Sequence, residues 1–193
     1  MNASNYVIEL LIAGICSFVW MIILLLIFIP EFELYILFDA DSKLLISLIL
    51  LPIIYIIGII VDRLTDELFE YMFPLRKKYF NNLNDHREAL SLVYLHSDTL
   101  TKLYEYGRMR IRVCRSWIAN GTLILISTEI YIWTSGSVFS ISQKPALSLF
   151  IFILLSFLIT GAFVAWKKLN IKEFKFLLLQ NDLLRKSLNI EVR

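Results

Sequence analysis

The chain has 193 residues, of which 58% are hydrophobic and 14% aromatic, and its mean hydropathy is +0.69. A soluble domain is usually about 45–50% apolar, so this composition excludes an ordinary water-soluble globular protein. The formal net charge is only +2. Bulk charge therefore gives no indication of a nucleic-acid-binding surface, and we expect no direct contact with nucleic acid.

Four apolar stretches are long enough to cross a bilayer, whose core of about 30 Å requires about 20 helical residues. They cover residues 10–29, 44–61, 116–135 and 145–166. The first is expected to remain in the protein, because it lacks the basic flank and the small-residue cleavage site of a signal peptide. The sequence therefore predicts an all-α polytopic membrane protein with four transmembrane helices.

The distribution of Lys and Arg predicts the orientation of these spans. Residues 62–115 hold ten of the nineteen cations and residues 167–193 hold seven, whereas the two short hairpins contain only Lys43 and Lys144. Cytoplasmic loops carry an excess of Lys and Arg. Both termini and the middle loop are therefore expected on the cytoplasmic side of the plasma (inner) membrane.

This topology divides the chain into four parts. Residues 1–61 form one transmembrane hairpin, residues 62–115 a cytoplasmic helical loop, residues 116–166 a second transmembrane hairpin, and residues 167–193 a cytoplasmic helical tail. The loop has no Gly- or Ser-rich stretch that would indicate a linker. The second, third and fourth spans are each expected to continue as helices into one small cytoplasmic module.

Turn and capping signals predict the helices of the loop. Pro74 should end the continuation of the second span, because proline breaks a helix interior. Asp85, with Glu88 at the capping-box position, predicts a helix that runs through residue 95. Ser97 or Asp98 should cap a further helix that runs directly into the third span.

Glu129 is an acid within the third span. An ionisable residue inside a membrane suggests a functional site, here a protonation site, a pore-lining group or a hydrogen-bond partner of another subunit. A structural interpretation is also open. If Trp133 marks the outer aromatic belt, Glu129 lies one turn beneath the headgroups and bonds Ser127, Thr128, Tyr131 or water.

A basic run precedes the third span, and Arg108, Arg112 and Arg115 share one face of the expected helix. One interpretation is a contact with lipid phosphate, a nucleotide or an acidic partner. The other is that these residues anchor the span at headgroup level and pair with the acids at the base of the second span. An ion-pair clamp between Asp62 or Asp66 and Arg112 or Arg115 is the expected arrangement.

Two weaker patterns concern packing. Ala13 and Ser17 form a small-xxx-small pair, which permits close approach between membrane helices. Five rings gather in the cytoplasmic loop and suggest either a docking surface for a soluble partner or internal packing of the module. These are Phe69, Tyr71, Phe73, Tyr79 and Phe80.

Catalytic and metal-binding signatures are missing from the sequence. It contains no Gly-rich phosphate loop, no HExxH and no GxSxG, and its two histidines lie ten residues apart without a cysteine cluster. We expect no enzyme activity, cofactor or metal, and a lipid-handling enzyme has no motif to support it. The favoured function is a non-enzymatic oligomeric membrane subunit that serves as a sensor or anchor for a soluble cytoplasmic partner.

The alternative is a pore-forming effector or small channel with Glu129 near the pathway. Such a channel should place the polar residues of the third span on one lumen-facing stripe, whereas a scaffold should bury them against its own helices. These residues are Asn120, Thr122, Ser127, Thr128 and Glu129.

Four spans with short outer hairpins and a small cytoplasmic helical module resemble the small membrane subunits of bacterial antiphage defence systems such as Kiwa. The resemblance covers the whole chain and concerns architecture alone. It implies a protein that senses disturbance of the envelope and relays it to a cytoplasmic effector. It implies no particular site residue.

Overall fold

The computed structural model describes residues 3–29, 43–80, 82–135 and 141–187. Its regular elements there are helices, as the all-α prediction requires. They are α1 (Ala3–Phe28), α2 (Lys43–Met72), the 3₁₀ turn η2 (Leu75–Lys78), α3 (Leu83–His96), α4 (Asp98–Thr134) and α5 (Lys144–Ser187).

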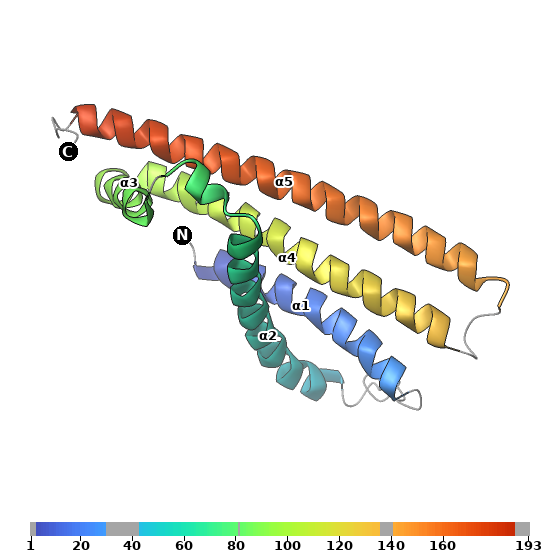
Figure 1. Ribbon diagram of the computed structural model, residues 1–193. Coiled ribbons are helices and arrows are strands. Elements are labelled where there is room, and N and C mark those ends of the chain that lie inside the picture. The colour runs from blue at the N-terminus through green and yellow to red at the C-terminus, as the bar shows by residue number, and fades with distance from the viewer. Residues whose placement is uncertain (1–2, 30–42, 81, 136–140, 188–193) are drawn as a thin grey trace.

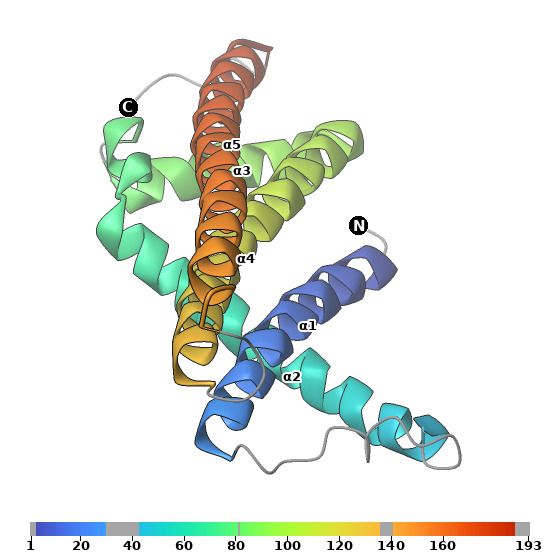
Figure 2. The same cartoon turned by 90° about the vertical axis from the view of Figure 1, so that its right-hand side faces the viewer.

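Helix α4 lies in the middle of the molecule and packs against both α1 and α5 (Figure 1). Helix α2 crosses α1 (Figure 2). Helix α3 packs on α4 and α5 at one end of the molecule, and the beginning of α1 and the end of α5 point toward that same end (Figure 1). The second half of α5 and the first half of α4 therefore belong to a module that α3 and η2 complete.

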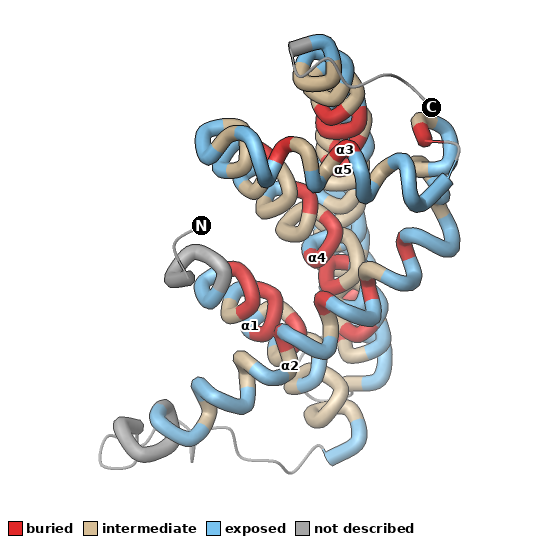
Figure 3. The backbone as a smooth tube through the Cα atoms, turned by 90° about the vertical axis from the view of Figure 1, so that its left-hand side faces the viewer, coloured by how far each residue is buried: buried red, intermediate tan, exposed pale blue. Residues whose placement is uncertain are grey.

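Three of the described helices contain a stretch long and apolar enough to cross a membrane: Val7–Phe28, Leu48–Met72 and Lys144–Lys186. Large apolar side chains on these stretches are exposed, and Phe157 of α5 is 75% exposed. Figure 3 shows long exposed or half-buried stretches along these helices. Contiguous apolar surface of this extent requires lipid or protein cover. The predicted third span, the apolar half of α4, is not one of the three, because polar residues such as Asn120 and Glu129 lower its hydropathy.

Helices α2, α4 and α5 are longer than a bilayer requires, with 30, 37 and 44 residues. At 1.5 Å per residue α5 extends about 66 Å, roughly twice the thickness of a bilayer core. One crossing therefore needs only part of α5, and the part after Trp166 begins with Lys167 and Lys168. The structure thus contains the uninterrupted helices expected from the sequence.

The helix ends follow the predicted signals with two corrections. Helix α2 ends at Met72, just before Pro74, and Ser97 caps α4 by accepting a hydrogen bond from the backbone N–H of Leu100 at 3.3 Å. Helix α3 begins earlier than predicted, because the backbone N–H of Asn82 donates to the carboxylate of Asp85 at 3.2 Å. The first apolar stretch that could cross a membrane also begins earlier, at Val7 rather than residue 10, within a helix α1 that starts at Ala3, so Glu9 belongs to it.

The module that α3 and η2 complete has its own apolar core in two clusters. The first joins η2, α3, α4 and α5, and the second joins α2, α4 and α5. Their buried members are Phe80, Ala89, Val93, Tyr104, Phe174 and Leu177 in the first, and Phe69, Ile111 and Trp166 in the second.

Four of the five rings expected as a docking surface or as core are core residues. Phe69 and Phe80 are buried, and Phe73 and Tyr79 pack against the clusters. Tyr71 is 88% exposed. Of these five rings, only Tyr71 therefore remains as a candidate for docking a soluble partner.

Asn120 joins α4 to α1 in the apolar half of the molecule. It is fully buried, and its Oδ1 accepts hydrogen bonds from Ser17 Oγ at 2.8 Å and Trp20 Nε1 at 3.1 Å. Its Nδ2 donates to the backbone oxygen of Ala13 at 3.3 Å and to Ser116 Oγ at 3.2 Å. The predicted small pair, Ala13 and Ser17, is thus buried where α1 meets α4 and supplies hydrogen bonds as well as space.

Asn120→Leu is expected to lower the free energy of unfolding by roughly 1–3 kcal/mol, because it removes the acceptor of the Trp20 N–H and the bond to Ala13 O, while Ser17 keeps Ala13 O as an acceptor. Thr122→Val is the control, since Thr122 is exposed and its hydroxyl donates to Ile118 O within the same helix. The control should change stability by less than about 0.5 kcal/mol. Equal effects of the two substitutions in mixed-micelle unfolding would show that the Asn120 bonds do not hold α1 on α4.

Candidate functional site

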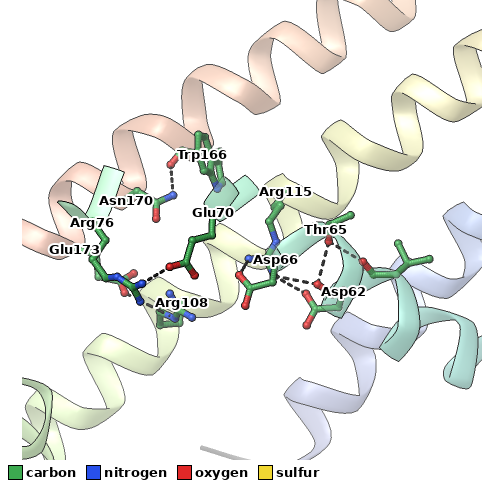
Figure 4. A network of polar contacts seen from close by, with 11 residues as sticks. Asp62, Thr65, Asp66, Glu70, Arg76, Arg108, Arg115, Trp166, Asn170 and Glu173 are labelled. Carbon is green, nitrogen blue, oxygen red and sulfur yellow. Dashed lines mark hydrogen bonds and ion pairs between the residues drawn. The ribbon is translucent and has the colours of Figure 1, made fainter. Parts of the chain in front are cut away.

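A polar network lies where α2, α4 and α5 leave their apolar halves (Figure 4). Arg115 of α4 is only 4% exposed. Its Nη2 lies 2.9 Å from Oδ1 of the buried Asp62, and its Nη1 pairs with Asp66. Both acids lie on one face of α2 because they are four residues apart. The arrangement expected as a clamp is therefore present with Arg115 as its cation.

The other arginines of the predicted basic face point to different helices. Arg108 reaches α5, where its Nε lies 3.9 Å from Oε1 of Glu173. Arg112 is close enough to Glu9 of α1 for the two charges to interact. The basic face thus connects α4 with α1, α2 and α5.

Sequence reasoning missed the two acids of these contacts, Glu9 and Glu173. Glu9 was placed before the first span, although it is 7% exposed within α1. Glu173 was overlooked in the tail, although it lies among the apolar positions Leu169, Phe176 and Leu177. An acid within an apolar helical stripe was the signal that could have identified it.

Glu173 is a buried carboxyl group, 7% exposed, with Tyr104 and Arg108 beside it. It lies seven residues beyond Trp166, outside the part of α5 needed to cross a bilayer. Burial raises the pKa of Glu173 to about 7, although Arg108 and then the hydroxyl of Tyr104 act in the opposite direction. Near neutral pH the charge of Arg108 is therefore only partly balanced.

Glu173→Gln is expected to stabilise the protein at pH 8 by about 2–3 kcal/mol, because it removes a buried charge. A carboxyl group whose folded pKa is raised contributes stability that is complete below about pH 4.5 and is lost as the pH rises through about 7. The difference between variant and wild type should therefore disappear near pH 4.5. Unfolding in mixed micelles at both pH values measures it, and a variant that is less stable at pH 8 would contradict this account.

A cavity of about 240 Å³ lies beside the network, between α2, η2, α3, α4 and α5. Aromatic rings form much of its wall. Its charged lining consists of four cations, Arg76, Lys77, Arg108 and Arg115, and two carboxylates, Asp66 and Glu70.

The two carboxylates of the cavity are engaged in ion pairs, Asp66 with Arg115 and Glu70 with Arg76. His86 lines the same cavity. The pKa of His86 is lowered to about 4, first by burial and then by the charges of Arg76 and Arg108. The imidazole is therefore neutral at pH 7, and the field in this part of the cavity is positive.

The side chain of Glu129 in α4 contacts α5, where Ser148 donates a hydrogen bond to its Oε2. Its Oε1 is buried and has no hydrogen-bond partner among the described residues. The bond to Ser148 was not predicted. Ser127, one of the expected partners, instead donates to the backbone oxygen of Ile124.

Glu129→Gln is expected to change the free energy of unfolding by less than about 1 kcal/mol, because the amide oxygen can still accept the bond from Ser148. Glu129→Leu is the comparison, since it removes the acceptor as well as the charge. Unfolding of Glu129→Gln that is as severe as that of Glu129→Leu would mean that the charge itself holds α4 against α5.

The polar residues of the predicted third span do not share one environment. Asn120 and Ser127 are buried, Glu129 bonds to α5, and Thr122 is exposed. Within one chain they therefore form no continuous polar stripe.

No protein-family model, curated protein or solved structure matches the chain. Function is therefore inferred from the geometry of these residues.

Proposed function

We propose that the protein is a non-enzymatic, four-span subunit of the plasma (inner) membrane, oligomeric, with both termini in the cytoplasm. It acts as a sensor or anchor for a soluble cytoplasmic partner. The apolar half of α4 is the third span along the chain, since it runs beside α1 and α5 (Figure 1). Its polar side chains Asn120 and Glu129 are tolerated in the membrane because both are hydrogen-bonded to other helices.

The observation that supports this function best is the continuity of α2, α4 and α5. Each runs without interruption from an apolar half into the module whose core they share. A helix is stiff over this length, so a tilt or displacement of the spans moves the module directly. Such coupling suits a protein that converts a change in the bilayer into a change presented to a cytoplasmic partner.

The environment of the polar residues supports a scaffold over a channel. Asn120 and Ser127 are buried, as a scaffold requires, and Ser148 holds Glu129. The exposed apolar surface of α5 can be covered by lipid and by further copies of the chain. The resemblance to membrane subunits of antiphage defence systems supports a protein that senses disturbance of the envelope. Cells challenged with phage should then lose protection when the gene is deleted, and unchanged survival would reject that role.

Cysteine labelling tests the topology on which this function depends. With Cys16 and Cys114 replaced by serine, Lys78→Cys should react with a membrane-impermeant maleimide only after the cells are permeabilised. Gln143→Cys should react in intact cells. Both positions are exposed, so access depends on the side of the membrane. Labelling of both in intact cells would reject the proposed orientation.

A pore is the second candidate, because one buried oxygen of Glu129 has no partner among the described residues. Several copies would have to bring this carboxyl group to a common pathway. Reconstituted protein should then conduct ions, and Glu129→Gln should change the conductance. An impermeable proteoliposome would remove this candidate.

A further inference from the structure

The cavity beside the polar network is lined by cations from two elements. Arg76 and Lys77 come from η2 and Arg108 comes from α4. Figure 4 shows Arg76 and Arg108 close together beside Glu70 and Glu173, while Arg115 lies apart with Asp62 and Asp66. The cavity therefore has a cationic end and an end occupied by the Arg115 clamp.

The positive charge at the cationic end is not fully balanced by carboxylates. Glu70 forms an ion pair with Arg76. Arg108 pairs with Glu173 at the long distance of 3.9 Å, and the pKa of Glu173 near neutrality leaves this acid only partly charged. No ion pair is recorded for Lys77 among the described residues. Lys77 and Arg108 are therefore the cations of the cavity with which an anion can pair.

The remaining wall defines the size and character of an occupant. Phe69, Phe73, Trp166 and Phe174 are apolar rings, and neutral His86 lies among the cations. A volume of about 240 Å³ is below the roughly 300–1,000 Å³ of drug-sized pockets. It suits a single phosphate group with a small apolar or aromatic attachment.

We propose that this cavity binds the phosphate group of a phosphate monoester through Lys77 and Arg108, with Arg76 close by and the ring wall against its apolar part. Lys binds phosphate as a point charge, and Arg binds it through its planar set of N–H donors. Two sources present this chemistry, a phosphatidic-acid headgroup from the inner leaflet or a soluble monoester. The site does not depend on the proposed sensor or anchor role, and only the lipid source depends on the proposed orientation.

Lys77 and Lys78 form a matched pair for testing the site. Both are exposed lysines of the same 3₁₀ turn, but only Lys77 lines the cavity. Purified full-length protein is titrated with phenyl phosphate in lipid-free neutral detergent. In a second arm it is placed in phosphatidylcholine nanodiscs with and without phosphatidic acid. Lys77→Gln and Arg108→Gln should weaken binding of at least one probe about tenfold, while Lys78→Gln stays within about twofold of wild type.

The two arms distinguish the sources. Binding of phenyl phosphate that is lost in Lys77→Gln supports a soluble ligand. If wild type binds phosphatidic acid in nanodiscs but does not bind phenyl phosphate, and Lys77→Gln no longer binds phosphatidic acid, the ligand is a lipid. Binding of neither probe by wild type, or equal losses in Lys77→Gln and Lys78→Gln, overturns the site, because the second result would show diffuse surface attraction. Lys77→Gln replaces an exposed side chain, so this comparison stands even if Arg108→Gln is destabilised.

His86 supplies an independent readout inside the cavity. A bound phosphate should raise the pKa of His86 from about 4, since a neighbouring anion stabilises the imidazolium. The ring signals of His86 can be followed by NMR titration with either probe, and those of His96, which does not line the cavity, serve as a reference. A probe that binds without moving the His86 titration binds elsewhere and contradicts the proposal.

Discussion

Arg115→Met is expected to lower the free energy of unfolding by about 3–5 kcal/mol, because it leaves a buried acid without its cation. Asp62 is 7% exposed and accepts a hydrogen bond from Arg115 at 2.9 Å. Asp66 remains partly exposed, with 45% of its side chain accessible, so it can be hydrated in the variant. The loss should therefore be due mainly to Asp62. Unfolding in mixed micelles measures it.

A second substitution separates charge from shape. Adding Asp62→Asn to Arg115→Met removes the unpaired buried charge, so the double variant should recover most of the lost stability. Arg110→Met, at an exposed position of the same helix, is the control and should cost less than about 1 kcal/mol. Additive losses in the double variant would show that Asp62 and Arg115 do not act as a pair. The sequence allowed Arg112 or Arg115 as the partner of Asp62, and the structure selects Arg115 for this experiment.

Gly14→Ala and Gly58→Ala are each expected to cost about 3 kcal/mol or more, because α1 and α2 touch backbone to backbone at these glycines. A Cβ atom on Gly14 would overlap the carbonyl oxygen of Ile54, and one on Gly58 would overlap that of Leu10. Neither obstacle is a flexible side chain that could turn away. The two helices would have to separate, which would weaken the crossing seen in Figure 2.

Gly161→Ala is the matched control for the glycine pair. It also lies inside an apolar helix, but a Cβ atom there meets nothing within 4 Å. Alanine favours a helix over glycine by about 1 kcal/mol, so this variant should be neutral or more stable. If Gly14→Ala behaves like Gly161→Ala in the same unfolding assay, the close approach of α1 and α2 does not contribute to stability.

Local patterns predicted the helices and one end of the polar network. Pro74 and Ser97 act on neighbouring backbone, so their roles could be read from the sequence. Asp62 and Asp66 could be matched with Arg115 because the acids share a helical face and opposite charges meet at the bases of adjacent spans.

Partners across helices could not be predicted in the same way. Ser17 and Asn120 are separated by 103 positions, and their bond depends on how α1 is rotated against α4. The same dependence hid the bond from Ser148 to Glu129 and the burial of Glu173 beside Arg108. The cavity arises only when α2, η2, α3, α4 and α5 pack together, and none of these elements contains it alone.

Native mass spectrometry tests the proposed function most directly. The protein would be extracted in mild detergent from cells that also express its neighbouring genes. The proposed sensor or anchor predicts a homo-oligomer that carries a soluble cytoplasmic protein in fixed stoichiometry. A homo-oligomer without any soluble partner, conducting ions after reconstitution, would contradict it and favour the pore.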